Sequence, residues 1–224
     1  IDDKTPTAAE EIWDGLDVTT SGRVGAAGST GVFNYVNTFE GITFNGAWRK
    51  GSGTANSDGA SSNDSSSEGA YDFALTTDGS LVGLDGLAVG AGYGEARQGN
   101  STTTNYGDIE HMTAFVNYSV GPVTLGYQAS YLDSNFHGTP DQDAQRWGVA
   151  FNINENFSVS YGEADTKFDG TAANSSDVEE NIEGIAVAYT MGSMKIAGNM
   201  NEGENMGGVA ASKDSMTEIA VSFA

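Results

Sequence analysis

Apolar and polar residues alternate along most of the chain from about residue 32 onward. Successive side chains of a β-strand point to opposite faces of the sheet, so this period of two predicts strands. From Trp147 to Ile153, for example, every second residue is large and apolar. The same pattern predicts eleven strands in all, beginning with a less regular one at Val32 to Phe39 and ending with one at Met216 to Phe223.

The segments between these strands alternate between short and long. The short ones are at Glu40-Gly41, Asp78 to Gly86, Gly121-Pro122, Asn154-Glu155 and Gly192-Ser193. The long ones are at Gly51 to Gly69, Arg97 to Asp108, Asp133 to Asp143, Lys167 to Glu179 and Glu202 to Asp214. If consecutive strands are antiparallel, all the tight turns lie at one end of the sheet and all the long loops at the other. Transmembrane β-barrels are built in this way.

The two faces of the predicted strands differ in kind. One face is aliphatic and aromatic, whereas the other consists mainly of Gly, Ala, Ser, Thr and Asn. A water-soluble sandwich would carry charged residues on its polar face, but a small, uncharged face suits a hydrated barrel interior. Aromatic residues near the strand ends are expected in girdles at the membrane interfaces, although the general preference of aromatic residues for strands explains part of their placement. These residues are Tyr131, Trp147, Phe157 and Tyr189.

Composition excludes several classes of function. The net charge of −22, with 31 acidic against 9 basic residues, argues against nucleic acid as a partner because phosphate contacts need clustered Lys and Arg. The chain has no cysteine, so it has neither a disulfide framework nor thiol chemistry. Much of the acid is expected in solvated loops, at Asp58, Asp64, Glu68, Asp141, Asp143, Asp165, Asp177, Glu179 and Glu180.

Three segments resemble the last hairpins of alphaproteobacterial general porins, most closely those of marine planktonic bacteria. The segments are Trp147 to Gly162 (WGVAFNINENFSVSYG), Ile185 to Gly192 (IAVAYTMG) and Glu218 to Ala224 (EIAVSFA). The resemblance implies an outer-membrane location, a homotrimer of 16-stranded barrels, passive diffusion of small hydrophilic solutes, and contact with outer-membrane lipid and lipopolysaccharide. We therefore expect an all-β transmembrane barrel whose missing strands precede Ile1.

The opening segment resembles the third loop of these porins, which folds into the barrel and narrows it. The likeness is clearest at Thr7 to Gly15 (TAAEEIWDG). It implies an inward-folded constriction loop at residues 1–22, followed by barrel strands at residues 23–224. Within the loop, Thr7 is expected to cap a short helical turn with Glu10 as its capping-box partner, and Gly15 to end it.

Porins of this family place acidic groups of the inward loop opposite basic groups on the wall, and the resulting field filters solutes by size and charge. By this resemblance the acidic candidates are Glu10, Glu11, Asp14 and Asp17. The basic candidates are Arg49 and Arg146, followed by Arg23 and Lys195. An alternative places Arg49 and Arg146 at the loop end, where they would contact lipid head groups or loop carboxylates. From the excess of acid we expect a mild preference for cations.

Other functions find less support in the sequence. The two histidines, His111 and His137, lie on different predicted elements, and no catalytic motif accompanies them, so we expect no enzyme and no cofactor. Calcium binding by loop carboxylates is a weaker hypothesis, since Ca²⁺ needs several oxygen ligands and no stretch has EF-hand spacing. The competing class is an acidic, secreted or surface-located β-rich structural or adhesive protein that binds calcium, but the β-roll repeat is absent from the sequence.

Overall fold

The computed structural model is a single antiparallel sheet in which each strand pairs with its neighbours in sequence. It describes residues 1–16, 25–28, 31–51, 67–98, 107–135, 140–170 and 176–223. The strands are β1 (Val32–Phe39), β2 (Ile42–Lys50), β3 (Ser67–Asp78), β4 (Leu87–Gln98), β5 (Ile109–Val120), β6 (Val123–Asp133), β7 (Gln142–Asn154), β8 (Phe157–Phe168), β9 (Val178–Met191), β10 (Met194–Glu204) and β11 (Lys213–Phe223). Two short 3₁₀ turns accompany them, η1 (Gly79–Val82) and η2 (Met206–Gly208). The expected all-β class and the eleven strands are confirmed.

The predicted alternation of connections is also confirmed. Short turns join β1 to β2, β3 to β4, β5 to β6, β7 to β8 and β9 to β10, and the longer connections lie between these hairpins. Glu40 and Gly41 both have positive φ (47° and 82°), which is the two-residue geometry that matches the twist of a hairpin. Because all pairs are antiparallel, every short turn lies at one end of the sheet.

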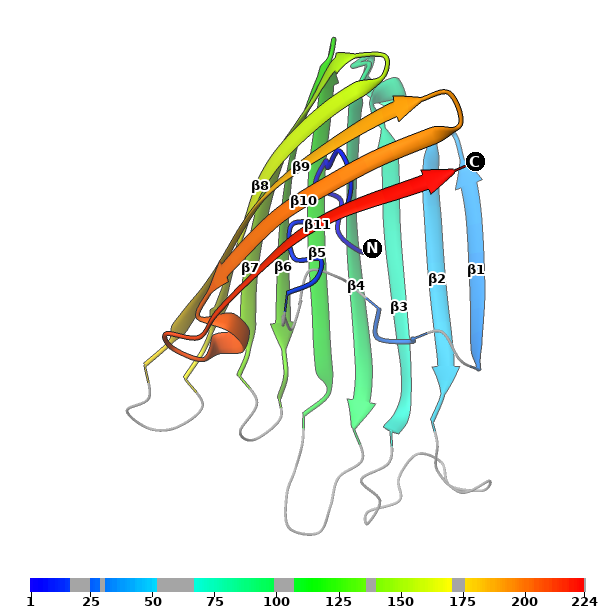
Figure 1. The fold of residues 1–224 in the computed structure, drawn as a ribbon. Helices are drawn as coiled ribbons and strands as arrows, with labels where there is room; N and C mark the ends of the chain where they lie inside the picture. The colour runs from blue at the N-terminus through cyan, green and yellow to red at the C-terminus, as the bar shows by residue number, and fades with distance from the viewer. Residues whose placement is uncertain are drawn as a thin grey trace.

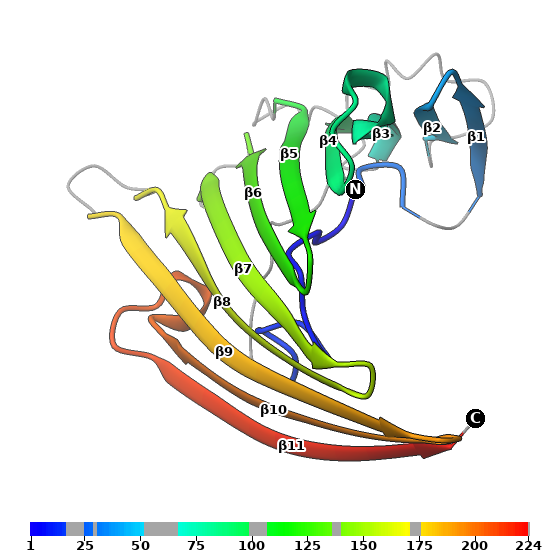
Figure 2. The ribbon, with the colours of Figure 1, turned by 90° about the horizontal axis from the view of Figure 1, so that it is seen from above.

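The sheet curves strongly, and its concave side holds the first residues of the chain. Figure 1 shows the strands as a bent wall with the dark-blue N-terminal segment behind β10 and β11. Figure 2, seen from above, places the same segment on the concave side. Within the described residues β1 and β11 form the two edges and do not pair with each other. We refer to residues 1–16 as the inward segment.

Contacts with the inward segment show which face of each strand is concave. Gln128, Ser160 and Asn201 bond to this segment, so residues of their parity face inward. The opposite parity gives the convex face, which exposes large apolar side chains on every strand pair; examples are Phe73, Leu125, Ile185 and Ile219. The predicted separation of a large apolar face from a small polar face is therefore present.

Two pairs of aromatic rings lie at different heights on this convex face. Phe157 packs against Tyr189 near the short turns, with ring centroids 6.5 Å apart. Nearer the long connections, Trp147 packs against Tyr161 at 5.6 Å. Phe157 and Tyr161 are only four residues apart on β8, about 13 Å, so the expected pair of interfacial girdles stays a prediction.

Three local expectations are wrong. Glu68, Asp143, Asp165, Glu179 and Glu180 lie in strands rather than loops, because β3, β7, β8 and β9 extend further than expected. Asp58 and Asp64 lie outside the described residues. The last strand begins at Lys213, three residues before the expected start. Thr7 does not cap a helical turn, since its hydroxyl donates to the carbonyl oxygen of Glu10 (2.6 Å). The turn in this segment is at residues 12–15, and Gly15, with a φ of 73°, ends it as expected.

The apolar core is small because most large side chains face outward. Leu16, Ala164, Ile182 and Met206 form one buried cluster that joins the inward segment to β8, β9 and η2. Among the described residues there is no helix with the length and apolar character needed to span a bilayer.

The convex face of β11 offers a test of where lipid contacts the sheet. Ile219 is 76% exposed on this face, and Ser215 lies four residues nearer the long connections. Ile219→Arg is expected to reduce the folding free energy of the complete protein in lipid vesicles by roughly 2–4 kcal/mol, since Arg at the bilayer midplane must be desolvated. Ser215→Arg, the control on the same face, is expected to cost about 0–1 kcal/mol. Equal effects in urea titrations would contradict this membrane orientation.

Candidate functional site

The inward segment has no regular secondary structure, so its main-chain polar groups need partners on the wall. Gln128 of β6 supplies two of them and is only 1% exposed. Its Oε1 accepts from the Lys4 amide (2.7 Å), and its Nε2 donates to the Asp2 carbonyl oxygen (3.2 Å). Nε2 also donates to the Thr113 hydroxyl (3.0 Å), which fixes the side chain against β5. Gln128 thus pairs with both an N–H donor and a C=O acceptor of the segment's main chain.

Three further wall residues continue this attachment. Asn117 of β5 donates to the carbonyl oxygen of Lys4 (2.6 Å), and the Ser160 hydroxyl of β8 accepts from the amide of Ala8 (2.8 Å). Asn201 of β10 donates to two carbonyl oxygens near the far end of the segment, those of Glu11 (3.3 Å) and Asp14 (3.1 Å). These side chains come from strands far apart in sequence, so only the sheet brings them together.

Arg146 of β7 lies beneath the segment and not in the open lumen. Its guanidinium carbon is 4.5 Å from the centre of the Trp13 ring, which is cation–π geometry, and the residue is 3% exposed. Asp2, Asp3 and Glu180 are close enough to interact with its charge. The predicted basic wall residue is therefore brought to the inward segment, but Trp13 covers it.

The predicted acidic residues of the segment are distributed unequally. Glu10 and Glu11 are exposed on the concave side, whereas Asp14 is half-buried. Asp17 and Arg23 lie outside the described residues. Sequence reasoning missed Asp3. Burial raises the pKa of its carboxyl group above the ordinary value, even though both the main-chain amide and the hydroxyl of Thr5 donate hydrogen bonds to it.

The other two basic candidates lie on the concave face away from these carboxylates. Arg49 of β2 has a buried Nε and lies beside Gly28, 4.0 Å from where a side chain on that glycine would begin. Lys195 is exposed near the short turns, six residues along β10 from Asn201. At roughly 3.3 Å per residue this separates the two by about 20 Å.

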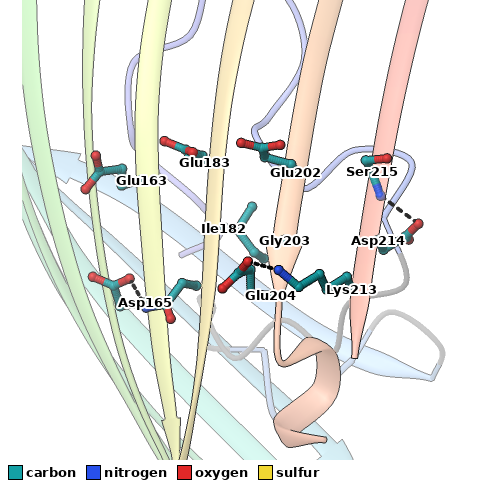
Figure 3. Close-up of a pocket in the computed structure, with 11 residues that line it drawn as sticks. Glu163, Asp165, Ile182, Glu183, Glu202, Gly203, Glu204, Lys213, Asp214 and Ser215 are labelled. Carbon is teal, nitrogen blue, oxygen red and sulfur yellow. Dashed lines mark hydrogen bonds and ion pairs between the residues drawn. The ribbon is translucent and has the colours of Figure 1, made fainter. Parts of the chain in front are cut away.

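Carboxylates gather on the convex face where the apolar band ends. Glu163, Glu183 and Glu202 are directly opposite one another in the registers of β8, β9 and β10, and Figure 3 shows them side by side. They border an open cavity of about 640 Å³, at whose edge Lys213 pairs with Glu204. Tyr161 donates its hydroxyl to both Glu163 (2.6 Å) and Glu183 (2.7 Å).

Asp165, which was expected in a loop, borders the same cavity, and this outward row is not part of the concave site. Among the described residues no three acidic or histidine side chains are grouped so that they could hold a metal ion. The arrangement on the concave face consists of main-chain attachment, exposed carboxylates and one covered guanidinium. Such a site can orient ions and polar solutes but offers no paired nucleophile and base.

Comparison with known proteins identifies the family. The sequence profile described as Gram-negative porin matches residues 2–208. The chain belongs to the Gram-negative porin family. Membership locates this porin in the outer membrane, separates it from enzymes, and does not favour the adhesive class considered above.

Solved structures with the same fold are distant in sequence. Outer-membrane OmpT of Vibrio cholerae superimposes with a TM-score of 0.57 at 16% identity, covering 85% of this chain and 62% of that one. The outer membrane channel DcaP of Acinetobacter baumannii superimposes with a TM-score of 0.59 at 14% identity, covering 97% of this chain and 67% of that one. This porin therefore spans about three fifths to two thirds of the length of these structures. No curated protein matches the sequence.

The buried carboxamide of Gln128 gives a test of how the segment is held. Gln128→Met keeps the shape but leaves the Lys4 amide without its partner, which costs about 1–3 kcal/mol when buried. Hydrogen exchange at this amide is expected to accelerate by roughly 5- to 150-fold. Gln145→Met is the control, because Gln145 is exposed on the convex face and accepts only from Tyr127. Unchanged exchange in Gln128→Met would mean that Gln128 does not hold the segment.

Proposed function

We propose that the complete protein forms a water-filled channel in the outer membrane through which small hydrophilic solutes and ions diffuse passively. The observation that carries this proposal is the position of the inward segment, which lies across the concave face of a curved sheet whose convex face is apolar. A segment that lies inside a barrel narrows the lumen but is not itself part of the barrel sheet. Residues 1–22 would form the constriction, and residues 23–224 would belong to the barrel wall.

The proposal includes a mild preference for cations. Glu10 and Glu11 are exposed toward the lumen, and the exposed Lys4 of the segment is balanced by the exposed Asp2. The basic wall residue beneath the segment, Arg146, is covered by Trp13. A permeating ion would therefore meet the carboxylates before it meets the guanidinium. Charged rings and pore width are general determinants of selectivity in channels.

The surroundings of the barrel follow from the same proposal. A trimer form of Vibrio cholerae OmpT, 12% identical to this chain, supports a homotrimer. The outward carboxylates beyond the Trp147 and Tyr161 rings would lie at the level of the lipid head groups, including lipopolysaccharide.

Charge removal on the inward segment tests the selectivity. In the complete protein reconstituted into planar bilayers, the reversal potential in a KCl gradient is expected to show cation preference. Glu10→Gln together with Glu11→Gln is expected to lower the cation-to-anion permeability ratio by roughly three-fold. A unit charge about 10 Å from an ion in water contributes about 0.4 kcal/mol, which about 0.1 M salt reduces to about 0.15 kcal/mol, and both charges act with opposite sign on the cation and the anion. Clear anion selectivity of the unmodified protein would overturn the preference, and absence of conductance would overturn the channel.

Uncovering Arg146 tests the role assigned to Trp13. Trp13→Ala removes the ring that lies over the guanidinium, so the lumen gains a positive charge and the cation preference is expected to fall. Adding Arg146→Ala to this variant is expected to restore the preference. If the double variant remains as weakly selective as Trp13→Ala, the change comes from displacement of the segment and not from the exposed charge.

A further inference from the structure

One row of inward residues crosses the wall at the height where the inward segment lies. The strand registers place these residues directly opposite one another on successive strands from β5 to β10. The row is Asn117, Gly126, Gly148, Gly162, Gly184 and Asn201. Four adjacent strands thus present glycine directly opposite one another, with an asparagine at each end of the row.

The glycines allow the main chain of the segment to approach the wall. A side chain on Gly148 would begin 3.1 Å from the carbonyl oxygen of Pro6, and one on Gly162 would begin 3.1 Å from Ile12. On Gly126 it would collide with Pro6, and on Gly184 it would begin 3.0 Å from the Cβ of Ile12. A branched side chain in the row would therefore displace the segment toward the lumen.

The two asparagines at the ends of the row make the same kind of contact, each with the neighbouring glycine and with the inward segment. The carboxamide of Asn117 lies over Gly126, and that of Asn201 lies over Gly184, where an added Cβ would be 2.5 Å from Oδ1. Each carboxamide then donates its Nδ2–H to main-chain carbonyl oxygens of the segment. Glycine is thus needed both beneath the segment and beneath the groups that hold it.

We infer that this row positions the inward segment through its main chain, so that Asn117, Asn201 and the four glycines fix the width of the constriction. The inference rests on the proposed channel function. It assigns the width of the constriction and the charge of the constriction to different residues. The wall sets where the segment lies, because it contacts main-chain atoms, Pro6 and Ile12. The exposed carboxylates of Glu10 and Glu11 set the charge without holding the segment.

A disulfide tests whether the seated position is the conducting one. The chain has no cysteine, and a Cβ on residue 148 would lie 3.4 Å from the Cβ of Thr5, close to the usual separation in disulfides. Thr5→Cys with Gly148→Cys is expected to oxidise nearly completely in the folded complete protein. The oxidised channel should keep the conductance of its reduced form to within about a factor of two, whereas a pore that closes on oxidation would overturn the inference.

Two substitutions test the row itself, each with a matched control. Gly148→Val is expected to lower single-channel conductance, while Ala88→Val, on the same row next to Asn117 but outside the glycines, should leave it unchanged. Asn201→Asp replaces a donor by a carboxylate facing two carbonyl oxygens, so amide exchange in residues 8–14 is expected to rise by about 10-fold. Asn45→Asp, on the concave face of β2, is its control.

The readouts separate this inference from the channel proposal. If the unmodified protein does not conduct, the channel proposal fails, yet disulfide yield and amide exchange still report whether the row holds the segment. If the protein conducts but Gly148→Val behaves as Ala88→Val does and Asn201→Asp exchanges no faster than Asn45→Asp, the row does not position the segment. A Gly148→Val variant that fails to fold leaves the decision to Asn201→Asp, which adds no volume to the wall.

Discussion

In a bilayer the main-chain N–H and C=O groups of a spanning strand must be paired inside the sheet, and this constraint governs the rest of the molecule. The eleven strands meet it with antiparallel ladders between neighbours along the whole sheet. Once the ladders are formed, each side chain is committed to one of two faces, and the register decides which residues stand side by side. The apolar convex face and the small concave face are consequences of that commitment.

The concave face must also accept a second main chain that has no ladder of its own. An irregular segment next to a wall leaves N–H and C=O groups that need partners, and a buried group without one is costly. Gln128, Ser160 and Asn201 satisfy several of them from three different strands. Glycines in the register row between Gln128 and Ser160 let the segment approach the wall closely enough for these bonds to form, so close approach and polar satisfaction depend on each other.

The sequence predicts this architecture well because its signals are local. Alternation along β7 or β9, and turn residues such as Glu40 and Gly41, are read from neighbouring positions, and they gave the strands, the order of short and long connections, and the two faces. Strand ends were harder to place. Asp165 and Glu179 were assigned to loops because strands that leave the membrane become polar before they end.

The site was predicted less completely because it depends on register between distant strands. Glu10, Glu11 and Arg146 were identified by resemblance, and the structure brings them to one region. That Trp13 covers Arg146, or that Asn117 and Asn201 close a row of glycines, follows from pairings that no local pattern shows. Asn117 was visible in the sequence only as one of many residues on a small polar face.

The net charge of −22 says little about the lumen, because the sheet divides the carboxylates between its faces. By parity, the convex side receives Glu95, Glu110, Asp133, Asp143, Glu163, Asp165, Glu179, Glu183, Glu202 and Glu204. The concave wall receives Asp72, Asp78, Glu180, Asp214 and Glu218. The excess acid on the convex side is separated from permeating ions by the wall. The charge at the constriction therefore depends on the inward segment, which exposes Asp2, Glu10 and Glu11 together with Lys4, more than on the net charge of the chain. A register shift of one residue in β9 would bring Glu183 into the lumen and Gly184 out of the row, so the same register fixes both the charge and the width of the pore.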